Sequence, residues 1–157
     1  MQLIEGNVLK HKEGIILHGC NVCGGFGSGI AGQIRARYPE AFDAYYSEFG
    51  SASLQHPKKE RLGGIQPVTI NEHLTIVNGF TQMYYGGKPN TKYADVVSIL
   101  SVLDHTVQLA IALKKNIYTV KIGCGLGGLD WIEVEPIFRT HAEIMADHGL
   151  ELVVYWM

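Results

Sequence analysis

Two glycine-rich segments are the places where the residue types and spacing of this chain could support chemistry. Six glycines fall within residues 19–32 and four within residues 123–128, and glycine makes up 19 of the 157 residues. Glycine lets the backbone approach a ligand closely and presents amide N–H groups to anions. Two such segments could hold the two parts of a diphosphate ligand, whereas tight turns alone are the structural alternative.

The first segment does not match the common nucleotide-binding signatures. Its run of Gly24-Gly25-Phe26-Gly27-Ser28-Gly29 is not followed by Lys and Ser or Thr, so it is not a phosphate loop of the NTPase type. It also fits the dinucleotide-binding fingerprint poorly, and no acidic residue follows at the expected distance. Any ligand site in this segment must therefore be of another kind.

The elements that must position these segments alternate along the chain. Short apolar runs predict strands at residues 1–5, 14–19, 64–70, 74–80, 117–122 and 150–156, and helical patterns cover residues 29–38, 40–49, 93–115 and 131–148. Strands alternating with helices predict an α/β fold with helices on both faces of a sheet, and the pair at residues 64–80 makes that sheet mixed. Each glycine-rich segment follows a buried strand and precedes a helix, where open α/β sheets bind ligands.

Length and composition limit the class of protein further. A chain of 157 residues with 46% hydrophobic and 18% charged residues is predicted to form one domain, residues 1–157. The net charge of −2 argues against extended nucleic-acid binding. Polar and charged residues interrupt the apolar stretch at residues 94–113, and residues 1–5 do not resemble a secretory signal. Three cysteines indicate a reducing compartment, so we expect a cytoplasmic protein. We also expect a monomer with no membrane partner.

The two segments resemble the ligand loops of a known family, the macro domains. The first loop of that family is similar to Ile16-Leu17-His18-Gly19-Cys20-Asn21 followed by Gly25-Phe26-Gly27-Ser28-Gly29-Ile30-Ala31. The second is similar to Ile122-Gly123-Cys124-Gly125-Leu126-Gly127-Gly128-Leu129-Asp130-Trp131. The resemblance is strongest to the branch with the ADP-ribose 1''-phosphate phosphatases and the terminal ADP-ribose protein glycohydrolase. It implies a three-layer α/β/α sandwich with a central mixed sheet that binds ADP-ribose.

The resemblance also implies which residues hold the ligand. The adenine end would be formed by Asn7, Val8, Tyr155 and Met157, with Asn7 in place of the family's usual acid. The distal ribose and diphosphate would lie against Asn21, Gly27, Ser28, Gly29 and Ile30. The second loop, Gly123, Cys124, Gly125, Leu126 and Gly127, would grip the diphosphate through its backbone, so that no Arg or Lys is needed. Turn formation is the alternative for the two asparagines, and core packing for the C-terminal aromatic residues.

The reaction implied by the resemblance depends on where this chain departs from the family. The glycohydrolase uses a lysine nucleophile and an aspartate in the second loop. This chain has Thr81-Gln82-Met83 near the lysine position and Gly127 at the aspartate position. Hydroxyl and amide groups cannot form a Schiff base, so we expect hydrolysis of ADP-ribose 1''-phosphate to ADP-ribose and phosphate instead.

His18 and Asn21 are the candidate catalytic residues for that reaction. The imidazole of His18 titrates near neutrality and could transfer a proton, while Asn21 could orient the distal ribose or a water. A strand-end histidine satisfied by the backbone is the alternative for His18. Asp95 is a further candidate, although an acid at the start of a helix also suits the helix dipole.

Two other functions remain compatible with the sequence, and no cofactor or metal is expected for the preferred one. The loops could serve an ADP-ribose reader without catalysis, or a hydrolase of ADP-ribose on protein or nucleic acid or of O-acetyl-ADP-ribose. The CxxC formed by Cys20 and Cys23, with His18 and Cys124, could form a thiol or zinc site. A redox pair would normally lie at a helix start, whereas glycine-rich residues intervene here.

Overall fold

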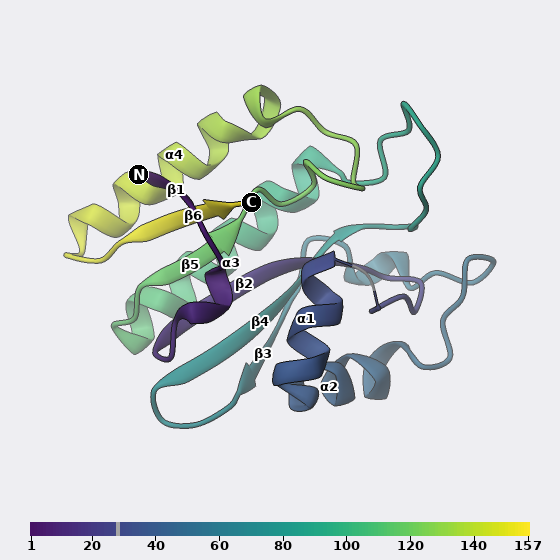
Figure 1. Ribbon diagram of the computed structural model, residues 1–157, viewed down its shortest axis with the longest axis horizontal. Helices are drawn as coiled ribbons and strands as arrows, with labels where there is room; N and C mark the ends of the chain where they lie inside the picture. The colour runs from purple at the N-terminus through teal and green to yellow at the C-terminus, as the bar shows by residue number, and fades with distance from the viewer. Residues whose placement is uncertain (28) are drawn as a thin grey trace.

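A mixed six-stranded sheet forms the centre of the protein (Figure 1), in a computed structural model that describes residues 1–27 and 29–157. The strands are β1 (Gln2–Glu5), β2 (Gly14–Asn21), β3 (Ile65–Thr69), β4 (Leu74–Gln82), β5 (Ile117–Val120) and β6 (Leu152–Trp156). Their order is β1-β6-β5-β2-β4-β3, and every neighbouring pair is parallel except the hairpin β3–β4. The predicted mixed sheet is confirmed.

Four α-helices cover the two faces of the sheet, which confirms the predicted α/β/α layers. They are α1 (Gly29–Arg37), α2 (Pro39–Phe49), α3 (Val96–Leu113) and α4 (Trp131–Asp147), and two short 3-10 turns, η1 (Val8–Lys10) and η2 (Lys59–Arg61), lie in the connections. One hydrophobic core lies between the sheet and α3 and α4, and the other between the sheet and α1 and α2. Residues alternate between these cores along β2, because successive side chains of a strand point to opposite faces.

The helix boundaries differ from the sequence predictions in two places with a clear local cause. Pro39 does not merely stop α1 but begins α2, where its fixed φ suits the first helical position. α3 begins at Val96 rather than at residue 93, because the carboxylate of Asp95 accepts hydrogen bonds from the backbone N and the hydroxyl of Ser98. Asp95 is therefore a helix cap, which accounts for an acid at this position.

α3 is the longest and most apolar helix. Its 18 residues have a mean hydropathy of 1.8, which would be enough by length and composition to cross a membrane. Ser98 and Thr106 are buried, and five apolar residues pack into the first core at helical spacing: Ile99, Val102, Leu103, Val107 and Ala110. The helix therefore forms part of the hydrophobic core on the face of the sheet that α3 and α4 cover.

β2 is the central strand that positions both glycine-rich segments. It pairs with β4 on one side and with β5 on the other, and both pairings are parallel. The carboxyl ends of β2 and β5 therefore point the same way, and the two glycine-rich segments leave the sheet next to each other.

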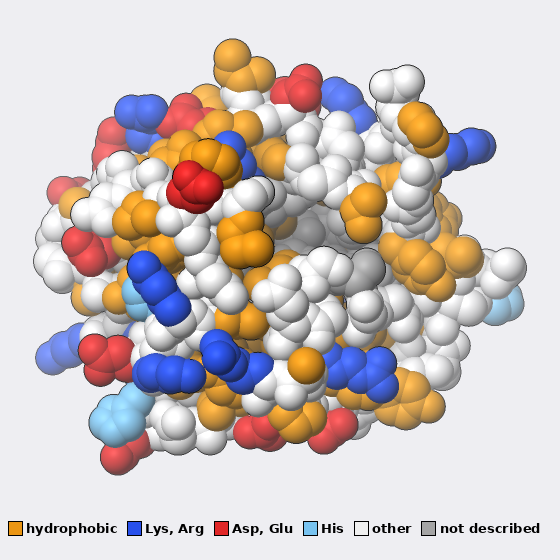
Figure 2. Space-filling model, in the orientation of Figure 1, with side chains coloured by type: hydrophobic (Ala, Val, Ile, Leu, Met, Phe, Trp, Pro, Cys, Tyr) orange, Lys and Arg blue, Asp and Glu red, His pale blue; other side chains and the backbone are white. Residues whose placement is uncertain are grey.

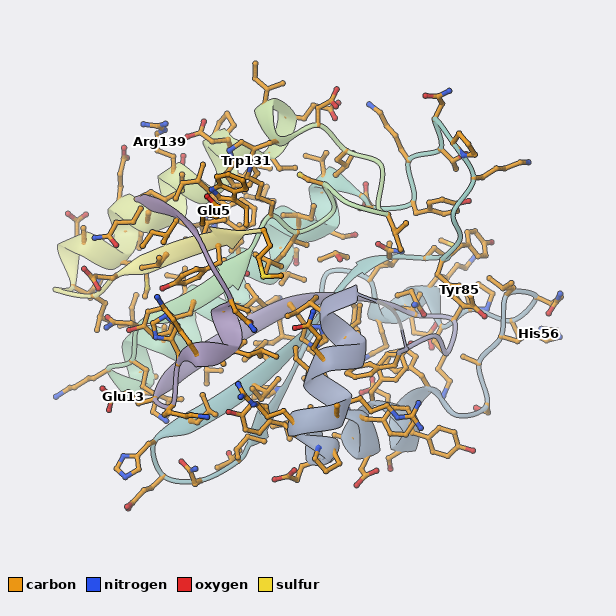
Figure 3. All side chains as sticks on the ribbon, viewed as in Figure 1. Glu5, Glu13, His56, Tyr85, Trp131 and Arg139 are labelled. Carbon is orange, nitrogen blue, oxygen red and sulfur yellow. The ribbon has the colours of Figure 1, made fainter. Side chains whose placement is uncertain are left out.

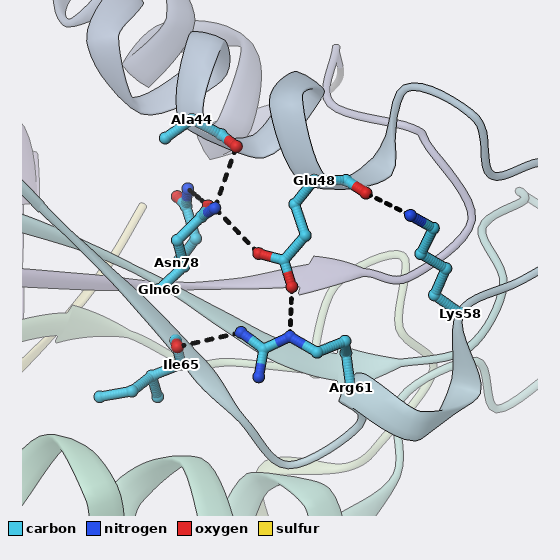
Figure 4. Close-up of polar contacts among 7 residues, drawn as sticks. All are labelled: Ala44, Glu48, Lys58, Arg61, Ile65, Gln66 and Asn78. Carbon is cyan, nitrogen blue, oxygen red and sulfur yellow. Dashed lines mark hydrogen bonds and ion pairs between the residues drawn. The ribbon is translucent and has the colours of Figure 1, made fainter.

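A chain of buried and partly buried hydrogen bonds connects β2 and β4 to the helix layer, and Figure 4 shows its part from Asn78 to Arg61. Asn78 on β4 accepts from His18 at 2.6 Å and donates to Gln66 on β3 at 3.0 Å. Gln66 in turn donates to the carboxylate of Glu48 on α2 at 3.0 Å, and Arg61 forms an ion pair with the same carboxylate. Every member of this network has a partner, which is what a buried polar group requires.

The contact between β4 and α3 predicts a stability effect at Gly79. A Cβ atom at this position would lie 2.6 Å from Cγ1 of Val102 and 3.2 Å from Cδ1 of Leu17. Gly79→Ala should therefore lower the free energy of unfolding by about 1–3 kcal/mol, measured by urea denaturation. Gly87→Ala is the matched control, because a Cβ there meets no atom within 4 Å and should change stability by less than about 0.5 kcal/mol. Equal stabilities of the two variants would contradict the close packing of α3 on β4.

Candidate functional site

A cavity of about 660 Å³ opens where the carboxyl ends of β2, β4 and β5 meet. Figure 2 shows this face of the molecule, where the central hollow is surrounded largely by backbone and hydrophobic side chains. Its lining comes mostly from the first loop, the start of α1, the segment after β4 and the second loop. Tyr85, labelled in Figure 3, lies on the segment after β4, and a Cβ at Gly25 would lie 2.7 Å from the tyrosine ring.

A second cavity of about 390 Å³ adjoins the first. It is lined by Asn7 and Val8 after β1, by Cys124 in the second loop, and by the C-terminal Tyr155, Trp156 and Met157. Ile30, Val120, Lys121 and Gly125 line both cavities. The two cavities therefore form one elongated cleft with a constriction between α1 and the second loop.

The middle of the cleft offers backbone amide groups. The N–H groups of Gly125, Leu126 and Gly127 have no acceptor among the residues that the structure describes. The opposite wall contains Gly29, Ile30 and Ala31 in the first turn of α1, where amide groups of a helix lack intrahelical partners. Unpaired amides and a helix N-terminus on facing walls favour an anionic ligand in this position.

Most of the sequence-predicted binding residues line this cleft. The smaller cavity is lined by Asn7, Val8, Cys124, Gly125, Tyr155 and Met157, and the larger by Asn21, Gly27, Gly29, Ile30, Gly123, Gly125, Leu126 and Gly127. Ser28 lies outside the described residues. Two predicted residues already have structural hydrogen bonds: the Asn7 side chain accepts from the backbone N of Leu9 at 2.9 Å, and the Tyr155 hydroxyl pairs with His11 at 2.6 Å.

Asn21 lines the cleft, but most of the hydrogen bonds of its side chain are made within and beside the first loop. Its side-chain oxygen accepts from the backbone N of Cys23 and Gly25 and from the Tyr45 hydroxyl at 2.9–3.1 Å. Its amide nitrogen donates to the carbonyl of Gly25 at 2.7 Å. Asn21 thereby fixes the curve of the loop, and one amide hydrogen is left for a ligand.

His18 does not lie in the cleft, contrary to the placement expected from the sequence. Its side chain is fully buried on the face of β2 covered by α1 and α2, edge-on to Phe26. Because the amide of Asn78 donates to Ala41 and Gln66, its oxygen faces the ring, so Nε2 of His18 carries the donated proton. Burial lowers the pKa of His18 to about 4. The geometry gives His18 a role in the core and does not support proton transfer to a ligand.

The sequence analysis named Thr81 and Gln82 only as a departure from the lysine of the glycohydrolase, and it did not predict that the end of β4 forms a side wall of the cleft. Thr81, Gln82 and Tyr85 line the larger cavity. The hydroxyl of Thr81 is the one buried side-chain polar atom without a hydrogen-bond partner among the described residues. It faces Gly19, where a Cβ would approach it to 2.6 Å. The register shift between β2 and β4 at Cys20 and Asn21 was the missing information, because a bulge re-aims side chains in a way that strand periodicity does not show.

Comparison with known proteins finds relatives of low sequence identity, two of them of similar length and one considerably longer. No family model matches the sequence. The chain is 28% identical to an uncharacterised 17.5 kDa protein of Enterobacteria phage T4, covering 98% of this chain and 94% of that protein. It is 25% identical to an ADP-ribose 1''-phosphate phosphatase of Candida glabrata, covering 97% and 96% of the two chains. It is 26% identical to a DNA ADP-ribosyl glycohydrolase of Mycobacterium tuberculosis, of which it covers 40%.

Solved structures show which fold the chain has. The macrodomain of Mycobacterium tuberculosis DarG has a TM-score of 0.77 at 22% identity, covering 98% of this chain and 97% of that one. A Trypanosoma brucei macrodomain in complex with ADP-ribose has a TM-score of 0.70 at 13% identity, covering 98% and 61%. This chain has the macrodomain fold. The resemblance predicted from the two glycine-rich segments is thereby confirmed.

The cleft has almost no charged side chains. Among the described residues that line its two cavities, Lys121 alone has a charged side chain, and none is an aspartate, a glutamate or a histidine. The second loop also leaves no room for an acid at Gly127, because a Cβ there would lie 2.6 Å from the carbonyl oxygen of Gly123. The loop conformation therefore excludes the aspartate that the glycohydrolase has at this position.

The thiols of the protein are poorly suited to redox or metal chemistry. Burial raises the pKa of Cys20, which lies 3.7–3.8 Å from the ring nitrogens of His18. Burial also raises the pKa of Cys23, and it raises that of Cys124 to about 11. A reactive or metal-binding cysteine needs an accessible thiolate. No three potential metal ligands come together within the described part of the chain.

The buried position of His18 predicts a pH dependence of stability. Its pKa is about 4 in the folded protein and about 6.5 when exposed, so unfolding takes up a proton between these values. The free energy of unfolding should therefore fall by about 3 kcal/mol as the pH drops from about 6.5 to about 4. His18→Gln can still donate to Asn78 but does not titrate, and should lose this component in urea titrations at each pH. An unchanged pH slope in His18→Gln would contradict the assignment.

The unpaired hydroxyl of Thr81 predicts an unusual stability effect. Thr81→Val removes a buried group without a partner and should leave the free energy of unfolding unchanged or raise it by up to about 1 kcal/mol. Thr119→Val is the matched control, because that buried hydroxyl donates to the carbonyl of Leu17 at 2.8 Å, and its loss should cost about 1 kcal/mol. Thermal and urea unfolding measure the stability of both variants. A loss in Thr81→Val as large as that in Thr119→Val would mean that the hydroxyl has a partner inside the protein.

Proposed function

We propose that this macrodomain binds ADP-ribose along the cleft and hydrolyses ADP-ribose 1''-phosphate to ADP-ribose and phosphate. The observation that carries the proposal is the elongated cleft itself, with two cavities that join between Ile30 and Gly125. The adenosine would occupy the smaller cavity, beside Asn7 and the end of β6. The diphosphate would lie at the constriction with the unpaired amides, and the distal ribose would lie in the larger cavity.

The chemistry of the larger cavity favours a phosphate ester over a glycosidic bond. Gln82 and Gly127 line this cavity, at or near the positions where the resemblance places a lysine nucleophile and an acid, and neither residue can take those roles. Transfer of a phosphoryl group depends mainly on positioning and on stabilising charge with donors such as backbone amides. Water would add to phosphorus, the bond to the ribose oxygen would break, and the phosphate itself could supply the proton to that oxygen. The similarity to an ADP-ribose 1''-phosphate phosphatase supports this assignment.

A second candidate function is an ADP-ribose reader without catalysis. The observation that favours it is the absence of acids and histidines from the described lining of both cavities. A reader needs the cleft and its amide groups but no group that transfers a proton. Binding without turnover would therefore separate the reader from the phosphatase.

Two assays on the purified protein test the proposal. Phosphate release from ADP-ribose 1''-phosphate should show turnover, and calorimetric titration should show binding of the product ADP-ribose. Gly125→Glu should abolish both, because a Cβ at this position meets no atom within 4 Å, yet the added carboxylate would repel a diphosphate at the constriction.

Gln55→Glu is the matched control, since it adds the same charge on an exposed loop away from the cleft. It should leave turnover and binding unchanged. If the wild type shows heat of binding but releases no phosphate, the protein is an ADP-ribose reader and not a phosphatase. Absence of both signals would overturn the proposed ligand altogether.

A further inference from the structure

Lys121 is the one residue with a charged side chain among the described residues that line the cleft, and its environment is unusual. It follows β5 directly and lines both cavities, at the constriction between them. Its ammonium lies 5.4 Å from the ring centroid of Trp131 and 5.5 Å from that of Trp156. These are the two tryptophans of the chain. An ammonium within about 6 Å of an aromatic face is attracted by the ring.

The two tryptophans come to Lys121 from different parts of the fold. Trp131 begins α4 (Figure 3), and Trp156 ends β6, the strand that pairs with β5. The side chain is therefore held at a fixed place beside the second loop, where its charge also acts to lower the pKa of Cys124 against the larger effect of burial. A side chain that is already held loses less conformational entropy when it meets a ligand.

The positive charge of Lys121 has no carboxylate partner. Within the described residues, no Asp or Glu oxygen lies within 4 Å of its ammonium. A carboxylate at the start of α4, that of Glu133, is instead bound by Lys92 at 2.8 Å and by the backbone N of Asp130 at 3.0 Å. A partly desolvated cation without a counter-ion favours an incoming anion more strongly than a fully hydrated one.

We infer that Lys121 is a specificity residue that binds the diphosphate of the ligand and discriminates ADP-ribose from uncharged adenosine. The inference rests on the proposed binding of ADP-ribose in the cleft. It adds a charged side chain to a site that the sequence suggested would work through backbone groups alone. The amides of the second loop fix where the phosphates lie, and the ammonium beside them provides attraction that depends on ligand charge.

Lys121→Met tests the inference, because methionine keeps an unbranched side chain between the indole rings and removes the charge. Calorimetry should show that binding of ADP-ribose weakens about tenfold, as expected for the loss of one charge-assisted contact. Binding of adenosine should stay the same. Added salt should weaken ADP-ribose binding in the wild type more than in the variant. Lys121→Arg should bind ADP-ribose within about threefold of the wild type, because it restores the charge.

Lys92→Met is the matched control for net charge. Lys92 lies outside both cavities and pairs with Glu133, so its loss should leave ADP-ribose binding unchanged. Because both tryptophans flank Lys121, their fluorescence gives a second titration signal for each ligand and each variant.

The outcomes separate this inference from the function on which it rests. Wild-type binding of ADP-ribose that Lys121→Met retains in full overturns the role of Lys121 and leaves the proposed function intact. An equal loss of adenosine and ADP-ribose also overturns it, since Lys121 would then be a wall of the adenosine pocket. Failure of the wild type to bind ADP-ribose overturns the proposed function and the inference with it.

Discussion

The parallel pairing of β2 with β5 is the constraint on which the candidate site depends. It brings together two loops that are about a hundred residues apart, as the pairing of Leu17 with Thr119 shows. Both strands then end at the same edge of the sheet, so the first loop with α1 and the second loop with α4 face one another. The cleft, its constriction and its unpaired amides all follow from that adjacency.

A cleft built from glycine loops has particular chemical consequences. Glycines let the two loops approach each other and the start of α1, and at Gly127 the packing against Gly123 leaves no space for a side chain. Polarity then comes from amide dipoles, which do not titrate and cannot act as nucleophiles. Such a site is suited to holding phosphate groups, and the few side chains that do reach it, Lys121 and Thr81 among them, have a large share in deciding what it does there.

The polar residues beside the cleft have a different role from those in it. His18 and Asn78 lie in adjacent strands that are buried on both faces, and they connect the sheet to α2 through Gln66 and Glu48. Isolated polar groups in such a position would be costly, whereas a fully paired network is stable and favours one strand register. His18 was a candidate for catalysis because it lies close in sequence to the first loop. Its side chain, however, points from β2 into the core.

Much of this fold was determined by local sequence patterns. Alternation of apolar runs predicted the six strands and four helices, and the glycine clusters predicted which loops line the cleft, because both signals depend on residues close together in the chain. Tertiary structure alone decided the direction of each side chain at the strand ends. The shift in register between β2 and β4 aims Thr81 at Gly19, and the pairing of β5 with β6 brings Trp156 to Lys121. These placements depend on strand pairing across the sheet, which periodicity along one segment does not encode.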